Sequence, residues 1–113
     1  EDPAELDAAF ATSFGAPVAK TEPATSVTSN SAMLNAFIEP SGGETTYHLE
    51  YGTTKSYGTS VPVPDASLES DSKPQSIDEA ITGLQSQTTY HYRIVASNGA
   101  GQAVGKDVKF KTG

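Results

Sequence analysis

Apolar and polar side chains alternate along most of this chain, and a period of two residues is typical of strands with one buried face. The clearest alternation begins at Tyr90 and ends at Ser97, with Tyr92, Ile94 and Ala96 on the same side as Tyr90. Further strands are predicted at Val18 to Val27 with an interruption at Pro23, at Ser31–Glu39, at Thr45–Tyr51, briefly around Tyr57, at Gln75–Thr82, and in a closing hairpin strand from Gly101 to Lys111.

Two stretches depart from simple alternation. The segment from Val61 to Pro74 is rich in Pro, Ser and Asp and shows no period, so we expect a long surface connection there. In Gln75–Thr82, Glu79 falls on the same face as Ile77 and Ile81. Because a buried, unpaired carboxylate is costly, this strand is expected to contain a bulge at Glu79 or to lie at the rim of its sheet.

The strand Ser31–Glu39 predicts a core face and an exposed apolar face. The inward residues would be Ala32, Leu34, Ala36 and Ile38. Met33 and Phe37 would then point away from the core together with Asn35. Large apolar side chains on an outer sheet face usually mark an interface, so we expect something to cover them.

The first residues have the pattern of a helix start, with a capping Asp2, Pro3 at the first helical position and Glu5 three residues after the cap. We predict a helix from Pro3 to about Ser13 within an N-terminal extension of residues 1–16, the alternatives being a linker or the last strand of a preceding domain. A helix would present Leu6, Phe10 and Phe14 to the outer sheet face near Phe37. The competing interpretation is that Met33 and Phe37 dock a neighbouring domain or a partner.

The turn before the Tyr90 strand carries a second signal. Leu84 precedes Tyr90 by six residues, the spacing of a tyrosine corner, in which a buried tyrosine hydroxyl bonds the backbone a few residues upstream. The supporting motifs are Tyr47-His-Leu-Glu-Tyr51-Gly52 and the turn Asn98-Gly-Ala-Gly.

With these motifs the chain resembles fibronectin type III modules, specifically those found in tandem in bacterial secreted and surface proteins, over Pro17 to Thr112. The resemblance implies a Greek-key β-sandwich domain, residues 17–113, of about seven strands. It places the first, second and Gln75–Thr82 strands in one sheet and the remaining four in the other. The family usually has Trp where Ala36 stands, so we expect tyrosines of the opposite sheet to fill the core there.

The composition excludes several classes of partner and site but does not identify a function. The 113 residues suffice for one domain, and the net charge of -7 indicates an acidic surface. The seven basic residues are scattered along the sequence, which disfavours nucleic acid as a partner. The absence of cysteine excludes disulfides, thiolate metal sites and a cysteine nucleophile. No apolar run reaches the about 18 residues of a membrane span, and we expect the chain to be a piece of a longer protein.

The polar candidates favour structural roles. The implied register places His48 opposite Val95 and His91 near Gly52, too far apart to share a metal ion, and both histidines are expected to be solvated surface residues. The same register pairs Glu50 with Arg93 as a cross-strand ion pair or a recognition spot.

The acidic residues of the long connection do not match a calcium loop. Asp65, Glu69 and Asp71 lack the alternating ligands, central Gly and distal Glu of such a loop. They predict a solvated acidic loop, with weak calcium binding left open.

No catalytic constellation or cofactor motif is recognisable, so we expect a protein that is not an enzyme and needs no cofactor. The resemblance implies a spacer or protein-interaction module in a larger secreted or surface protein, with neighbouring domains as partners. The alternative is a carbohydrate-binding accessory domain, for which Phe37 and Tyr57 are the candidate aromatic platforms. The predicted interaction patch is Met33, Phe37 and Tyr57.

Overall fold

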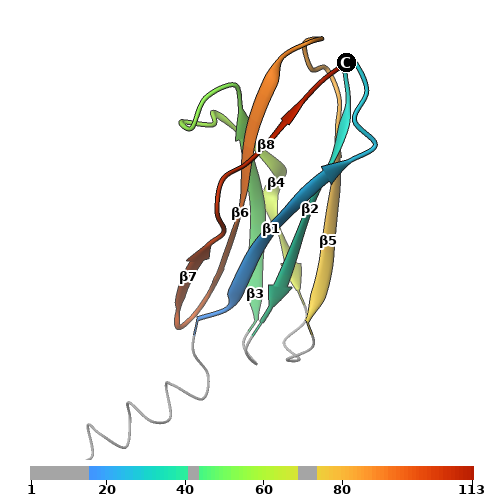
Figure 1. Ribbon diagram of the computed structural model, residues 1–113. Helices are drawn as coiled ribbons and strands as arrows, with labels where there is room; N and C mark the ends of the chain where they lie inside the picture. The colour runs from blue at the N-terminus through green and yellow to red at the C-terminus, as the bar shows by residue number, and fades with distance from the viewer. Residues whose placement is uncertain (1–15, 41–43, 69–73) are drawn as a thin grey trace, which may run out of the picture.

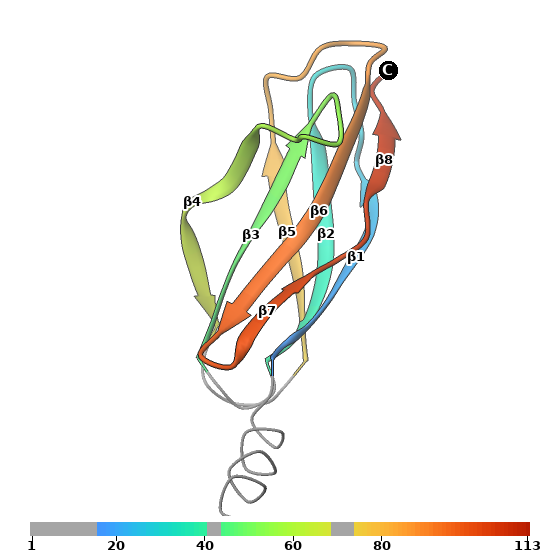
Figure 2. The same cartoon turned by 90° about the vertical axis from the view of Figure 1, so that its left-hand side faces the viewer.

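The computed structural model describes residues 16–40, 44–68 and 74–113, which form eight antiparallel strands in two facing sheets (Figure 1 and Figure 2). The strands are β1 (Val18–Thr25), β2 (Ala32–Glu39), β3 (Thr45–Gly52), β4 (Thr59–Leu68), β5 (Gln75–Ile81), β6 (Thr89–Asn98), β7 (Gly101–Val104) and β8 (Val108–Lys111). The smaller sheet has the order β1-β2-β5, and the larger has the order β4-β3-β6, with β7 and β8 both pairing with β6. The chain is therefore a β-sandwich. The expected division of strands between the two sheets is confirmed with one correction: the brief strand expected around Tyr57 is wrong, because residues 53–58 form a turn and the edge strand β4 begins at Thr59.

Some expectations fall outside the described ranges. These are the helix from Pro3 to Ser13, its packing near Phe37, and the positions of Glu69 and Asp71. Within the described ranges there is no helix that could cross a membrane.

The predicted closing strand is divided by a bulge into β7 and β8. Val95 pairs with Val104 and Tyr92 with Val108, so residues 105–107 face only two residues of β6. The N–H of Gly105 donates to the carbonyl oxygen of Ile94 at 2.8 Å. A Cβ at Gly105 would lie 2.3 Å from Oγ1 of the buried Thr21, so the close approach of β1 requires glycine here.

The prediction that Val61 to Pro74 is a surface connection is wrong for most of its length, because β4 occupies Thr59–Leu68. β4 is an edge strand, where proline is tolerated since not every backbone group must join the ladder. Its pairing with β3 is interrupted between Tyr47↔Ala66 and Leu49↔Val61, which leaves residues 62–65 in a bulge.

The core lies between the sheets and follows the predicted alternation. Ala32, Leu34, Ala36 and Ile38 of β2 are buried, and the intervening Met33 and Phe37 are half-buried on the outer face. From the opposite sheet Tyr92 is fully buried, and its hydroxyl donates to the backbone carbonyl of Glu22. A tyrosine thus contributes the largest fully buried side chain of a core that has no tryptophan.

The turn before β6 is fixed by Tyr90. Its hydroxyl oxygen accepts a hydrogen bond from the backbone N–H of Gln85 at 2.8 Å. Leu84 and Tyr90 are both buried, and Phe110 of β8 stacks on the Tyr90 ring with 5.6 Å between centroids. The backbone N–H of Leu84 donates to the carbonyl of Asn30 at 3.0 Å, so the turn is also joined to the loop before β2.

Each sheet edge carries a feature that discourages pairing with another chain. β1 has Pro23 and a register shift between Glu22 and Thr25, and β4 and β7/β8 have their bulges. β5 is regular along its whole pairing with β2, so the bulge expected at Glu79 is absent. The alternative, a position at the rim, is confirmed: β5 is an edge strand and Glu79 is half-buried.

Candidate functional site

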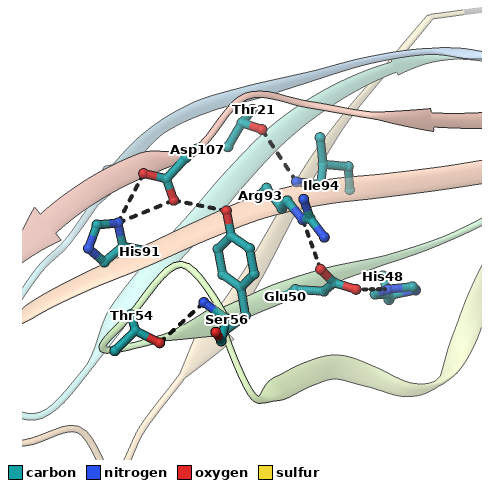
Figure 3. Close-up of polar contacts among 10 residues, drawn as sticks. Thr21, His48, Glu50, Thr54, Ser56, His91, Arg93, Ile94 and Asp107 are labelled. Atoms are coloured by element: carbon teal, nitrogen blue, oxygen red, sulfur yellow. Dashed lines mark hydrogen bonds and ion pairs between the residues drawn. The ribbon is translucent and has the colours of Figure 1, made fainter.

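Seven polar side chains contact one another across the larger sheet, and Figure 3 shows most of them. We call them the polar strip: His48, Glu50, Tyr57, Asp65, His91, Arg93 and Asp107. They come from β3, β4, β6, the turn at 53–58 and the bulge before β8. The strip is the largest polar assembly on this sheet among the described residues, and we therefore take it as the candidate functional site.

The centre of the strip is the pair Glu50 and Arg93. The predicted register is confirmed, and Arg93 Nε donates to Glu50 Oε1 at 2.8 Å. The second Glu50 oxygen lies 3.1 Å from His48 Nε2. Burial alone would raise the pKa of Glu50, but the hydrogen bonds from His48 and Arg93 outweigh it and lower that pKa. Glu50 is therefore an anion whose two oxygens are both bound.

His48 connects this centre to the edge strand β4. Its Nδ1 lies 3.2 Å from Oδ2 of Asp65, while its Nε2 faces Glu50. Burial lowers the pKa of His48, but the hydrogen bonds to Glu50 and Asp65 outweigh it and raise that pKa overall. Ionised carboxylates only accept hydrogen bonds, so both contacts are satisfied together only when both ring nitrogens carry protons.

The other end of the strip is organised by Tyr57. Its hydroxyl donates to Oδ1 of Asp107 at 2.9 Å, and Nδ1 of His91 lies 2.9 Å from Oδ2 of the same carboxylate. Burial would raise the pKa of Asp107, but its bonds to His91 and Tyr57 lower it. The Arg93 guanidinium carbon lies 4.7 Å from the centre of the Tyr57 ring, a cation–π contact.

A tight turn places Tyr57 over the sheet. Its backbone N–H donates to the carbonyl of Thr54 at 3.0 Å, and its φ of 60° lies in the left-handed region. A Cβ at Gly52 would lie 1.7 Å from the Tyr57 carbonyl oxygen, so the turn can close only over glycine. The position of the ring thus depends on the residue that ends β3.

The expectation that both histidines are solvated is wrong. The His48 and His91 side chains are 19% and 17% exposed, and each contacts a carboxylate on another strand or in a bulge. The predicted register is confirmed, with His48 opposite Val95 and His91 opposite Gly52. Across the described ranges, no three His, Cys, Asp or Glu side chains gather in a way that could hold a metal ion.

A shallow, open depression of about 570 Å³ lies beside Arg93 and Tyr57. Its lining consists of Glu50, Lys55, Ser56, Tyr57, Gly58, Thr59, Ser60 and Arg93. Two further basic residues lie on the same outer face of the larger sheet: Lys109 pairs with His91, and Lys111 follows two positions later on the same side of β8. The scattered basic residues of the sequence therefore gather partly on one face, where Lys55, Arg93, Lys109 and Lys111 make four of the seven.

A second depression, of about 510 Å³, lies on the smaller sheet. It is lined by Glu22, Pro23, Thr25, Asn35, Ala36, Phe37, Ser76, Ile77 and Asp78. The structure does not bring the predicted patch together: Met33 and Phe37 lie on the outer face of β2, whereas Tyr57 belongs to the other sheet's strip.

Sequence reasoning missed Asp107 as a member of the strip, Lys55 in the lining of the depression, and the contact of Asp65 with His48. The one available signal was the alternation of Asp107, Lys109 and Lys111, which places these charges on one side of the chain.

No protein-family model matches the chain, and no curated protein matches it. Similar solved structures include the sensor domain of the anti-sigma factor RsgI4 in Pseudobacteroides cellulosolvens. A short form of that domain is 22% identical over 83% of this chain and 91% of its own, with a TM-score of 0.57. A solution structure is also 22% identical, covering 83% of this chain and 73% of its own, with a TM-score of 0.56. At this identity the likeness shows a shared sandwich fold.

Proposed function

We propose that this chain is a non-catalytic, fibronectin type III-like binding or sensing module of a larger secreted or surface protein. The observation that carries this proposal is the polar strip beside an open depression. Its side chains are held by one another, so the surface next to them is fixed in shape before any partner arrives. Such pre-organisation favours recognition.

The contacts of the two histidines support a role without catalysis. Both rings face carboxylates, and in the described part of the chain no hydroxyl group bonds to either ring. A hydroxyl nucleophile activated by histidine needs that contact. Glu50 and Asp107 have lowered pKa values, which suits a fixed anion better than a proton-transferring acid at neutral pH.

The described chain runs from one end of the sandwich to the other. β1 begins at one end of the sandwich and the C-terminus lies at the other, as Figure 1 shows. A module of this kind can join neighbours in line and leave its sheet faces accessible. The tyrosine hydroxyl contact before β6 and the sheet orders support placing the module among the fibronectin type III-like folds. Sensing enters the proposal by analogy of fold alone, from the solved sensor domains.

The test replaces residues 17–113 in the full-length protein with an unrelated sandwich module whose ends are equally far apart. A binding or sensing module predicts loss of the response or attachment that depends on the protein. Retention would mean that the module only sets a distance. Protease treatment of intact cells, followed by detection with an antibody to the module, tests surface exposure, which protection from the protease would refute.

A second candidate is carbohydrate binding at the depression on the smaller sheet. It is favoured by the half-buried Phe37, which lines that depression with Asn35 and Asp78, an aromatic surface beside groups that bind hydroxyls. On the larger sheet the Tyr57 ring is covered by Arg93, so it is not an open platform. Titration of the labelled chain with neutral oligosaccharides would test this candidate, which requires amide shifts confined to the surroundings of Phe37.

A further inference from the structure

We propose that the depression beside Arg93 binds the carboxylate of a hydroxyl-rich ligand, of which a uronic-acid saccharide is the model. This inference rests on the proposed binding function and names the chemistry that the site would recognise.

Arg93 uses only part of its guanidinium within the chain. Its Nε is used by Glu50, and its guanidinium plane contacts the Tyr57 ring. In the described part of the chain, neither of its two terminal amino groups has a hydrogen-bond acceptor. A guanidinium edge with two free amino groups can still donate to a planar carboxylate.

The guanidinium edge of Arg93 is held in position. Tyr57 supports the guanidinium from one side, and Asp107 and His91 fix the Tyr57 hydroxyl in turn. Arg93 is itself only 37% exposed. Little side-chain entropy remains to be lost when a ligand binds, which is the main advantage of a pre-organised site.

The charge around the depression favours an anionic ligand. Lys55 lines the depression, and Lys109 lies on the same outer face, beside His91. The nearby anions are already engaged: Glu50 accepts from Arg93 and contacts His48, and Asp107 is held by two partners. The charged groups that remain unengaged at the depression are therefore cationic, although the chain as a whole carries a net charge of -7.

The lining of the depression also indicates which kind of molecule carries the carboxylate. The rest of the lining is hydrophilic, with hydroxyl groups from Ser56, Thr59 and Ser60 and no aliphatic side chain. Protein interfaces place apolar side chains at their centres, which this depression does not offer. A saccharide carries hydroxyls that such a lining can bind, so an acidic saccharide fits better than an acidic peptide.

The experiment titrates the isotope-labelled chain with trigalacturonate and follows amide chemical shifts. The expected result is a set of shifts centred on Tyr57, Ser60 and Arg93 that disappears when the carboxylates are methyl-esterified. Arg93→Gln should weaken binding about tenfold or more, since the bidentate contact is lost. Lys20→Gln removes a positive charge from the other sheet and should leave the affinity within about twofold.

Lys55→Gln provides a second test should Arg93→Gln fail to fold, because Lys55 is exposed in a turn and should fold normally. It should weaken binding severalfold. Equal shifts with the methyl ester, or an equal effect of Lys20→Gln, would overturn the proposed site. Binding of tetraglutamate as tight as that of trigalacturonate would overturn the saccharide assignment. None of these results alters the outcome of the module-replacement test. The proposed carboxylate site can therefore be refuted without refuting the proposed binding or sensing function.

Discussion

The hydroxyl of Tyr90 offers the sharpest test of how the fold is held. Tyr90→Phe removes one oxygen atom, and the ring can keep its stacking on Phe110 at 5.6 Å. What is lost is the acceptor for the backbone N–H of Gln85, at present 2.8 Å away. A net hydrogen bond is worth about 0.5–1.5 kcal/mol, and an unsatisfied buried N–H costs about 1–3 kcal/mol.

The expected value lies in the lower part of this range. Tyr90 is 6% exposed, but the side chain of Gln85 is exposed, so water can reach the abandoned N–H after a small opening of the turn. We therefore expect Tyr90→Phe to lower the free energy of unfolding by about 1–2 kcal/mol. For a domain of this size that corresponds to a fall of about 4 °C in Tm per kcal/mol.

Urea unfolding of the wild type and two variants measures the effect. Tyr51→Phe is the matched control, because Tyr51 is a half-buried strand tyrosine whose hydroxyl has no hydrogen-bond partner in the described ranges. It should change the free energy by less than about 0.3 kcal/mol. If the two variants are equally stable, the Tyr90 hydroxyl does not support the turn and the reasoning is refuted.

Three further changes test other parts of the structure. Gly105→Ala should destabilise the fold by about 2 kcal/mol or more in the same assay, because the new Cβ would overlap Thr21; an unchanged midpoint would contradict the close approach. Glu79→Val should produce concentration-dependent association in analytical ultracentrifugation, since it removes the inward-facing charge from the regular edge strand β5 and leaves only the outward-facing Asp78; a monomer at all concentrations would refute this. The raised pKa of His48 stabilises the fold fully below the unfolded value of about 6.5, and this contribution is lost as pH rises through the folded pKa. The stability advantage of wild type over His48→Gln, up to about 1 kcal/mol, should therefore decline across that range, and a constant difference would exclude the imidazolium bridge.

The regular strands could be predicted because burial on one face makes their side chains alternate. In β2 the alternation from Ala32 to Ile38 identified the core face, and the outward position of Phe37 followed directly. β5 was also found, although Glu79 interrupts its apolar face. The inward-facing charge of Glu79 limits pairing of this edge with another chain. That explanation requires the strand order, which the sequence alone does not provide.

β4 was missed because its sequence shows no usable period. Pro62 and the bulge at 62–65 break the alternation of a strand that pairs on one side only. A hydrophobic alternation appears in the sequence only where one face of a strand is regularly buried. An edge strand that carries prolines is not buried regularly, so its sequence does not show the alternation. Composition rich in Pro, Ser and Asp is therefore compatible with an edge strand as well as with a loop.

Some contacts of the polar strip come from the regular strand register, and others depend on bulges in the strands. Glu50 and Arg93 face each other in an unbroken antiparallel register, and that pair could be predicted from the sequence. Asp65 belongs to the bulge in β4 and Asp107 to the bulge before β8. The two-residue alternation of side-chain direction does not continue through a bulge, because an extra residue there redirects the side chains that follow it. The two carboxylates that bind the histidines at the ends of the strip thus depend on backbone irregularities, and we infer that these bulges are what turn a common cross-strand ion pair into a pre-organised surface.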